Sequence, residues 1–369
     1  MSPVLPDDLI RAEVASLPSY NAGLALDRFR DVYGIDCVAK LDSNESPLGA
    51  SPRAIEAIHD HAAGVARYPD AANTALREKI AALHGHSADR VIFGNGSEDL
   101  IGALFRAVLR PGDHLVTVCP SFGLHEFGAL ACGASVAKVA FGPDWSYPVT
   151  GLIAAMQARA PRILIFSAPS NPAGPTLSEA DFRKLVAAVP DKTLIALDEA
   201  YIEYVSPSAR FDALSILSGC EKPWIVLRTF SKAYGLAGMR IGYGIGSDPV
   251  LIGAAMKTRN PFGVNALAVA AATKALEDTA HLDRVVELAR HERHRMIHAL
   301  KQLGYPSAPS ETNFVFFNNH RQATDLTAAL RRRGILVKPW LEAPYSDWAR
   351  VTLGSPAEND AFLTALEAI

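Results

Sequence analysis

Between residues 91 and 246, the chain alternates short apolar runs rich in β-branched residues with longer stretches of helical periodicity. The short runs predict strands, and an amphipathic stretch such as 100–109 predicts a helix between two of them. Strands that alternate with helices are typical of a mostly parallel sheet with helices on both faces. The expected strands are 91–93, 114–118, 135–140, 163–166, 193–197, 224–227 and 241–245.

The last third of the chain has a different pattern. Residues 265–303 predict mostly long helix with a break near Asp278–His281, and shorter strands and helices follow. This change favours a smaller α+β domain, whereas residues 1–43 show no strand pattern and predict an N-terminal arm that packs with it. We therefore expect an α/β fold with an arm over 1–43, a large domain over 44–260 and a small C-terminal domain over 261–369.

Composition narrows the class of protein. The chain has 36 Lys and Arg against 39 Asp and Glu, and this net charge of −3 excludes the strongly basic surface of a dedicated nucleic-acid binder. The four cysteines form no C-x-x-C pair, which argues against a disulfide scaffold or a zinc ribbon. No apolar run approaches the roughly 18 residues of a membrane span, and the N-terminus lacks a signal pattern. The expectation is a cytoplasmic enzyme without membrane partners.

Three sequence patterns are similar to nucleotide-binding or metal-binding motifs but are incomplete. Gly94-Asn95-Gly96 begins a dinucleotide fingerprint, but Asp99 stands where its last glycine should be. The acidic strand that ends at Asp198 is similar to that of a P-loop NTPase, yet the chain has no phosphate-binding P-loop. The helical stripe of His291, His294 and His298 has no nearby acid at a suitable spacing, so we favour a solvated polar face over a metal site.

Three segments follow expected strands and carry polar groups. Residues 94–99 form a glycine-bearing turn before a helix, where free N–H groups suit a phosphate, although an ordinary helix start would look the same. Asp198-Glu199 ends a strand, where a buried carboxylate needs a cationic or N–H partner. A ligand could be that partner, but a helix cap or a buried salt bridge would explain the two residues equally well. Because ligands of open parallel sheets bind beyond the carboxyl ends of the strands, these segments and a third one predict a common site.

The third segment, residues 228–240, is the most informative. Thr229 and Ser231 flank Lys232, and Arg240 follows after a glycine-rich connection. The two hydroxyls and the guanidinium group are donors that could hold a phosphate, and the lysine amine could form a Schiff base. A solvated surface loop would need neither this apolar composition nor this spacing of hydroxyls, lysine and arginine.

At these residues the chain resembles the pyridoxal-phosphate (PLP) aminotransferases of fold type I, and within them the histidinol-phosphate aminotransferase family. The resemblance rests on the Ser231–Arg240 segment, SKAYGLAGMR, and on DEAY at Asp198–Tyr201, and it runs from about Tyr20 to the C-terminus. Supporting segments are 43–49, 67–70, 94–99, 170–172, 260–265, 311–314 and 350–352.

The resemblance implies roles around the cofactor. Lys232 would hold PLP as a Schiff base and then move a proton on the substrate, while Asp198 would pair with the ring nitrogen. Asn171 and Tyr201 would bond the phenolic oxygen of the ring, and Phe122 would stack on its face. The groups implied at the phosphate are the backbone N–H groups of Ser97 and Glu98 and the side chains of Thr229, Ser231 and Arg240.

The resemblance also implies roles toward the substrate and a partner. Arg350 would bind the α-carboxylate, Asn44 would line the same pocket, and Tyr20 would touch the distal end of the substrate. Tyr68 would reach the cofactor phosphate of the other subunit, so the enzyme would be a homodimer. Lys338 stands where the family commonly has an arginine for the substrate phosphate, which keeps a positive charge but loses bidentate geometry.

The expected reaction is therefore the transamination of L-histidinol phosphate with 2-oxoglutarate, by a ping-pong mechanism that yields imidazole acetol phosphate and L-glutamate. Because Lys338 departs from the family, an aromatic or other amino-acid aminotransferase remains open, as does a phosphothreonine-type decarboxylase of the same fold. A PLP-binding transcription regulator is disfavoured because the chain has no basic helix-turn-helix segment.

Overall fold

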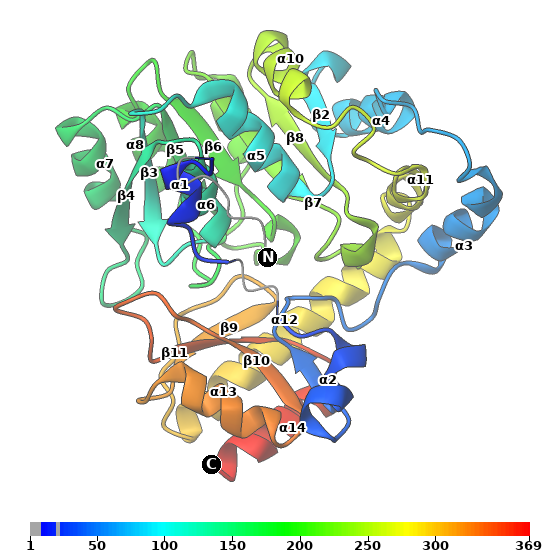
Figure 1. Cartoon of the computed structure of the whole chain (residues 1–369), viewed down its shortest axis with the longest axis vertical. Coiled ribbons are helices and arrows are strands. Elements are labelled where there is room, and N and C mark those ends of the chain that lie inside the picture. Colours follow the sequence, from blue (N-terminus) through cyan, green and yellow to red (C-terminus); the bar gives the residue numbers. More distant parts are fainter. Residues whose placement is uncertain (1–8, 20–22) are drawn as a thin grey trace, which may run out of the picture.

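The computed structural model describes residues 9–19 and 23–369, and it has two bodies that each contain a sheet (Figure 1). The sheet of the large body has the strand order β2-β8-β7-β6-β5-β3-β4, and only the pairs that involve β8 are antiparallel. This confirms the predicted mostly parallel, mixed sheet. Its strands are β2 (Val91–Gly94), β3 (His114–Cys119), β4 (Ser135–Ala140), β5 (Ile163–Ser167), β6 (Leu194–Asp198), β7 (Trp224–Thr229) and β8 (Gly242–Gly246).

Helices cover both faces of this sheet because successive strand residues point to opposite sides. In β5, Ile163 and Ile165 pack in one core and Leu164 and Phe166 in the other. The first core is closed by α5 (Ser97–Val108), α6 (Gly123–Ala131) and α10 (Pro249–Thr258). The second is closed by α3 (Pro52–His61), α4 (Thr74–His84), α7 (Val149–Ala158), α8 (Glu179–Ala188), α9 (Ala213–Ser218) and α11 (Ala266–Ala275).

The small body has a four-stranded sheet in the order β1-β10-β11-β9, with β1–β10 parallel and the other pairs antiparallel. Val337 of β10 and Val351 of β11 pack against helices on one face. Their neighbours Lys338 and Arg350 therefore lie on the opposite face, where the pocket is. The elements are β1 (Ala39–Leu41), β9 (Phe314–Asn318), β10 (Ile335–Pro339), β11 (Trp348–Thr352), α12 (Thr279–Gln302), α13 (Ala323–Arg331) and α14 (Pro356–Glu367).

The prediction that residues 1–43 contain no strand was wrong. Ala39–Leu41 form β1, which pairs with Ile335–Val337 of β10, and two short helices precede it, α1 (Ala12–Ala15) and α2 (Leu26–Tyr33). A strand of three residues is too short for a period-two pattern to be visible in the sequence. The segment that follows β1 is consequently fixed at the junction of the two bodies.

Helix α12 begins where the sequence predicted a break, because the Asp278 side chain accepts a hydrogen bond from the backbone N–H of His281 and caps its start. His291, His294 and His298 are exposed on this helix. Within the described ranges there is no cluster of three or more side chains that could hold a metal ion. Of the helices placed by the structure, including this one of 24 residues, none is long and apolar enough to cross a membrane.

Candidate active site

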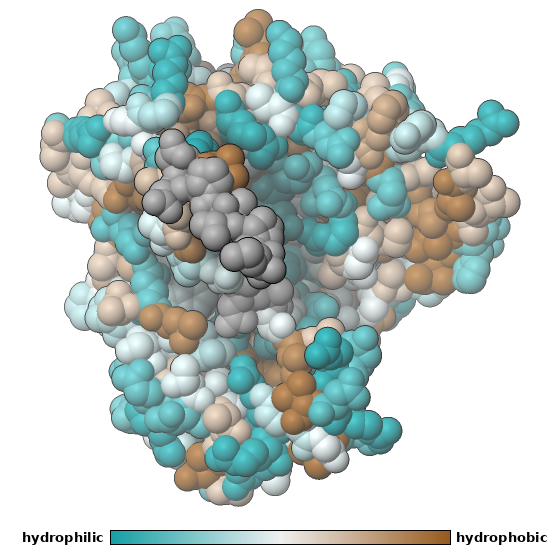
Figure 2. All heavy atoms as spheres, in the orientation of Figure 1, coloured by the Kyte–Doolittle hydropathy of each residue, from teal (hydrophilic) through white to brown (hydrophobic). Residues whose placement is uncertain are grey.

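A pocket of about 840 Å³ lies between the two bodies, a size that suits a small-molecule ligand. The face of the molecule in Figure 2 is hollowed between the bodies. The pocket walls include these residues that the sequence singled out: Asn44, Ser97, Glu98, Phe122, Asn171, Asp198, Tyr201, Thr229, Ser231, Lys232, Arg240, Lys338 and Arg350. The structure thus brings together the three segments that follow β2, β6 and β7, beyond the carboxyl ends of these strands, as the sequence predicted.

One end of the pocket is built around the start of α5. Gly96 has φ +84° and ψ 163°, a backbone conformation that is essentially restricted to glycine, and the Arg240 guanidinium group lies beside it. The helix that starts at Ser97 presents backbone N–H groups without partners inside the helix. Arg240 also pairs with Glu98, at 3.1 Å between Nη2 and Oε1. Glycine, helix start and guanidinium group together form a cradle for an anion.

Two hydroxyls complete this cradle at the end of β7. Thr229 Oγ1 donates to Ser231 Oγ at 3.0 Å, and both side chains are buried and line the pocket. Lys232 comes next, and its Nζ donates to the backbone carbonyl of Ser43 at 3.2 Å. Burial, together with the positive charge of Arg350, lowers the pKa of Lys232 to about 8. A buried amine with such a pKa is neutral often enough near neutral pH to act as a nucleophile or a base.

Asp198 is buried at the carboxyl end of β6, and it has a partner that sequence reasoning missed. Its Oδ1 accepts a hydrogen bond from the N–H of Ala200 at 3.1 Å, and its Oδ2 lies 3.3 Å from Nε2 of His125. His125 is fully buried, and Ser121 Oγ lies 3.1 Å from its Nδ1. His125 is three residues after Phe122, so its spacing on the first turn of α6 is a signal that could have identified it.

Two side-chain contacts join the two bodies at the pocket, one between Arg350 and Asn171 and one between Asn44 and Tyr201. Arg350 Nη1 donates to Asn171 Oδ1 at 2.7 Å, and Arg350 Nη2 donates to the backbone carbonyl of Asp42 at 2.8 Å. Tyr201 OH accepts a hydrogen bond from Nδ2 of Asn44 at 2.8 Å. Because Arg350 and Asn44 belong to segments of the small body and its flank, these contacts tie that body to the large sheet.

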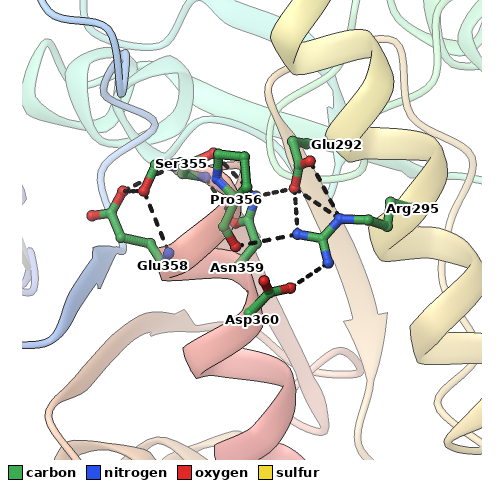
Figure 3. Close-up of polar contacts among 8 residues, drawn as sticks. Glu292, Arg295, Ser355, Pro356, Glu358, Asn359 and Asp360 are labelled. Atoms are coloured by element: carbon green, nitrogen blue, oxygen red, sulfur yellow. Dashed lines mark hydrogen bonds and ion pairs between the residues drawn. The ribbon is translucent and has the colours of Figure 1, made fainter.

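Strand β11, which carries Arg350, is held in place by a polar network at the start of α14 (Figure 3). Asn359 is fully buried, and its side chain bonds both the N–H and the carbonyl of Gly354, just beyond the strand. Its Nδ2 also donates to Glu292 at 2.6 Å, and Arg295 bonds Glu292 and Asp360. The network ties the end of the strand to α12 and so limits where the Arg350 guanidinium group can lie.

Lys338 lies beside Arg350, because these two residues are directly opposite in the β10–β11 ladder. Burial, with Arg350 as the second cause, lowers the pKa of Lys338 to about 8. Two neighbouring cations on one wall of the pocket favour an anionic ligand group there.

A second group that sequence reasoning missed lies at another part of the pocket wall. Lys138 of β4 bonds Glu126 of α6 at 3.1 Å and Glu342 of the small body at 2.6 Å. Trp340 Nε1 donates to the same Glu342 at 3.3 Å. Glu126 and Lys138 are 12 residues apart, but Glu342 is 204 residues from Lys138, so no local sequence pattern could predict this contact.

Tyr68 does not lie in the pocket of the single chain. The Tyr68 side chain is 83% exposed and stacks on the Phe262 ring, with 4.6 Å between the ring centroids. Tyr20 lies outside the described residues.

The polar groups of the pocket match the phosphate, the ring nitrogen and the aldehyde of PLP. The glycine-lined cradle suits the phosphate group, the buried Asp198 carboxylate suits a protonated ring nitrogen, and the Lys232 amine suits the aldehyde carbon. The Phe122 ring packs edge-on against His125 at the pocket wall and offers an aromatic surface. The residues present are therefore chemically complementary to the cofactor that the sequence predicted.

Known proteins are similar to the whole chain. The family model described as aminotransferase class I and II matches residues 37–366. The chain is 47% identical to histidinol-phosphate aminotransferase 3 of Rhizobium meliloti (strain 1021), over 99% of this chain and 98% of that protein. It is 46% identical to histidinol-phosphate aminotransferase 1 of Mesorhizobium japonicum, over 97% and 98% of the two chains. A crystal structure of histidinol-phosphate aminotransferase from Sinorhizobium meliloti in complex with pyridoxal 5′-phosphate matches with a TM-score of 0.89 and 30% identity, covering 98% of this chain and 97% of that one.

Proposed function

Because the chain belongs to the class I and II aminotransferases, and is thus a PLP-dependent transaminase, we propose that its reaction converts L-histidinol phosphate and 2-oxoglutarate to imidazole acetol phosphate and L-glutamate. The near full-length similarity to two proteins named histidinol-phosphate aminotransferase carries this choice of substrate. The adjacent cations Arg350 and Lys338 support it, because histidinol phosphate carries a phosphate ester where glutamate carries its α-carboxylate. We place this activity in the cytoplasm and in histidine biosynthesis.

The site residues take the following roles in this proposal. Asp198 pairs with the ring nitrogen of PLP, Asn171 and Tyr201 bond its phenolic oxygen, and Phe122 covers its ring. When bound, PLP supplies an electron-withdrawing ring that makes the Cα–H bond of the attached amino substrate acidic. The phosphate is held by Arg240, by the Thr229 and Ser231 hydroxyls and by the Ser97 and Glu98 N–H groups. Each charge-assisted bond contributes about 1.5–3 kcal/mol, so the set anchors the cofactor even when Lys232 is detached.

Lys232 acts twice in the proposed mechanism. Its amine would hold the cofactor covalently, and when free the same Nζ would serve as the base that takes up and returns the proton at the Cα of the substrate. Burial and the neighbouring Arg350 charge favour the neutral amine that this proton transfer needs. The Asp198 carboxyl group would lie beside the ring nitrogen, and Nε2 of His125 lies 3.3 Å from its Oδ2.

A homodimer completes the proposal. Tyr68 is highly exposed in the single chain and stacks on the half-exposed Phe262, and Leu48, Ile55 and Val65 are further exposed apolar side chains. A second copy of the chain would cover such side chains and bring Tyr68 to the phosphate of the partner's cofactor. We also propose the division into an arm (1–43), a large domain (44–260) and a small domain (261–369). The two separate sheets support two domains, whereas α11 packs in the core of the large sheet and β1 of the arm joins the small sheet, so these two elements cross the proposed boundaries.

A spectroscopic panel of half-reactions tests the substrate. The purified holoenzyme is mixed in turn with histidinol phosphate, glutamate, phenylalanine and phosphothreonine, and the change in cofactor absorption is followed. We expect fast conversion with histidinol phosphate and glutamate only. A preference for phenylalanine over histidinol phosphate, or carbon dioxide release from phosphothreonine, would replace the proposed substrate.

Replacing Arg350 with lysine should weaken the apparent affinity for glutamate about 10- to 100-fold, because the guanidinium group makes two parallel bonds to a carboxylate and an ammonium group does not. The measurement is KM in the glutamate half-reaction. Arg183→Lys, at an exposed ion pair on α8, is the matched control and should change nothing. An unchanged KM for glutamate in the Arg350 variant would remove this residue from the carboxylate site.

Replacing Lys338 with alanine should raise KM for histidinol phosphate by about tenfold and leave KM for phenylalanine unchanged, because only the phosphate uses this charge. Since the pKa of Lys338 is lowered to about 8, its charge is lost as the pH rises through that value. In the wild type, KM for histidinol phosphate should therefore rise above pH 8, and in the alanine variant this step should be smaller. Lys338→Arg is the control that keeps the charge. Equal losses for both substrates would show that Lys338 does not select the phosphate.

A further inference from the structure

Asn44 lies on the segment that leaves β1 and enters the pocket between the bodies. Its backbone is left-handed, with φ +56°, and the residue is only 1% exposed. A left-handed backbone is unusual for a residue other than glycine and is tolerated best by asparagine and aspartate. A buried polar residue in this conformation needs specific contacts to hold it, and all of its polar groups have them.

The backbone carbonyls around Asn44 fix the segment against the catalytic groups. The carbonyl of Asp42 accepts from Arg350 at 2.8 Å, and the carbonyl of Ser43 accepts from Lys232 at 3.2 Å. The carbonyl of Asn44 itself accepts from Asn313 Nδ2 at 3.0 Å. Three consecutive carbonyls thus receive donors from three different elements, and the side chain of Asn44 is held in a defined direction.

The side-chain amide of Asn44 is oriented by Thr352, the last residue of β11. Thr352 Oγ1 accepts a hydrogen bond from the backbone N–H of Asn44 at 2.9 Å and lies 3.1 Å from Oδ1 of the same residue. A hydroxyl has one proton, and here it is donated to Oδ1. The amide oxygen therefore faces Thr352, and the amide NH₂ group must face the other way, toward Tyr201.

That direction decides what the hydroxyl of Tyr201 can do. Nδ2 of Asn44 donates to Tyr201 OH at 2.8 Å, and an NH₂ group cannot accept a hydrogen bond in return. The single proton of the tyrosine hydroxyl is consequently directed away from Asn44. Tyr201 and Asn44 both line the pocket, so the hydroxyl can donate on the pocket side.

We propose that Asn44 is a positioning residue that makes the Tyr201 hydroxyl a hydrogen-bond donor toward the phenolic oxygen of the cofactor. The inference rests on the proposed place of Tyr201 beside that oxygen. Thr352 and Arg350 are two residues apart on β11 and share its pocket-facing side. The strand that binds the substrate carboxylate therefore also orients, through Thr352 and Asn44, the tyrosine that tunes the cofactor.

The proposal has a spectroscopic consequence. A hydrogen bond donated to the phenolic oxygen withdraws negative charge that would otherwise hold the proton on the Schiff-base nitrogen. Loss of this bond should make that nitrogen more basic. The pKa of the Schiff-base nitrogen is measured by a pH titration of the visible absorption of the holoenzyme without substrate, and it reports this change directly.

The test uses Asn44→Gly, because glycine adopts the same left-handed backbone while it removes the amide. We expect the pKa of the Schiff-base nitrogen in the holoenzyme to rise by about half a unit to one unit, which corresponds to the free energy of one hydrogen bond. Thr352→Val removes the hydroxyl that orients the amide and should raise the pKa in the same direction. Thr352→Ser, the matched control, keeps the hydroxyl and should leave it unchanged.

A double-mutant cycle with Tyr201→Phe separates the outcomes. If Asn44 acts through Tyr201, Asn44→Gly should add no further rise in the Tyr201→Phe background. An equal rise in both backgrounds would overturn the inference, since Asn44 would then act on the cofactor by another route. A rise for Tyr201→Phe but none for Asn44→Gly would also overturn it and leave the proposed function standing. No rise for Tyr201→Phe would remove Tyr201 from the phenolic oxygen, and the inference would fail with that assignment.

Discussion

Replacing Lys232 with alanine should lower the rate of transamination by about 10⁴-fold, because one side chain supplies both the covalent attachment and the proton transfer. The two functions can be separated. Adding a small primary amine to the variant should restore part of the proton transfer without restoring the attachment, since a diffusing amine can enter the space that the lysine side chain leaves. Full activity of the variant without added amine would refute the proposed role of Lys232.

Attachment is measured by borohydride reduction followed by mass spectrometry of peptides. The wild type should show the reduced cofactor on Lys232, and the alanine variant should show none. Because the pKa of Lys232 is lowered to about 8, the neutral amine accumulates as the pH rises through that value, and cofactor should attach to the apoenzyme faster above pH 8 than below it. Lys257→Ala, at an exposed position on α10, is the control and should behave like the wild type. A label on any other lysine would contradict the assignment.

Replacing Asp198 with alanine should reduce kcat by about 10²–10³-fold and cause loss of cofactor on dialysis, because a buried positive charge without its partner costs about 3–5 kcal/mol. Asp198 is buried, and its two oxygens contact the Ala200 N–H and His125. The next carboxylate in the chain, Glu199, is paired with Arg228 at 2.7 Å. Asp198→Asn, which keeps the shape but not the charge, should show a similar loss of kcat and retain its fold.

The measurements are kcat with glutamate and the amount of bound cofactor from its absorption. Asp191→Ala, in an exposed turn before β6, is the control and should match the wild type. If Asp198→Asn keeps nearly wild-type turnover, the ring nitrogen does not depend on a negative charge at this position.

Most of the fold could be predicted because its elements are long enough to show a period. Apart from the partly exposed edge strand β4, the strands of the large sheet are mostly buried on both faces, so they are visible in the sequence as apolar runs. Three-residue β1 was missed because alternation cannot be recognised over so short a run. Its partner in the ladder, β10, is almost 300 residues away, and such pairing leaves no local trace.

The candidate site also contains residues that the sequence could predict and contacts that it could not. The residues on the segments after β2, β6 and β7 could be predicted from spacing and resemblance, because each segment carries several informative positions close together. The contact of Asn44 with Thr352 joins residues 308 positions apart, and that of Lys138 with Glu342 joins residues 204 apart. Such pairs depend on how the two bodies meet, which no stretch of sequence encodes alone. His125 is an intermediate case, since its helical spacing from Phe122 was visible but ambiguous.

The path of the chain after β1 has a mechanical consequence. Strand β1 belongs to the small sheet, yet the three residues that follow it, 42–44, contact Arg350, Lys232 and Tyr201 of the pocket. Because Arg350 lies on β11 of the same small sheet, moving the small body outward would carry Arg350 along with this peptide and would break the contacts of the peptide with Lys232 and Tyr201 of the large body. The alignment of Arg350 with Lys232 and Tyr201 therefore depends on the closed arrangement of the two bodies.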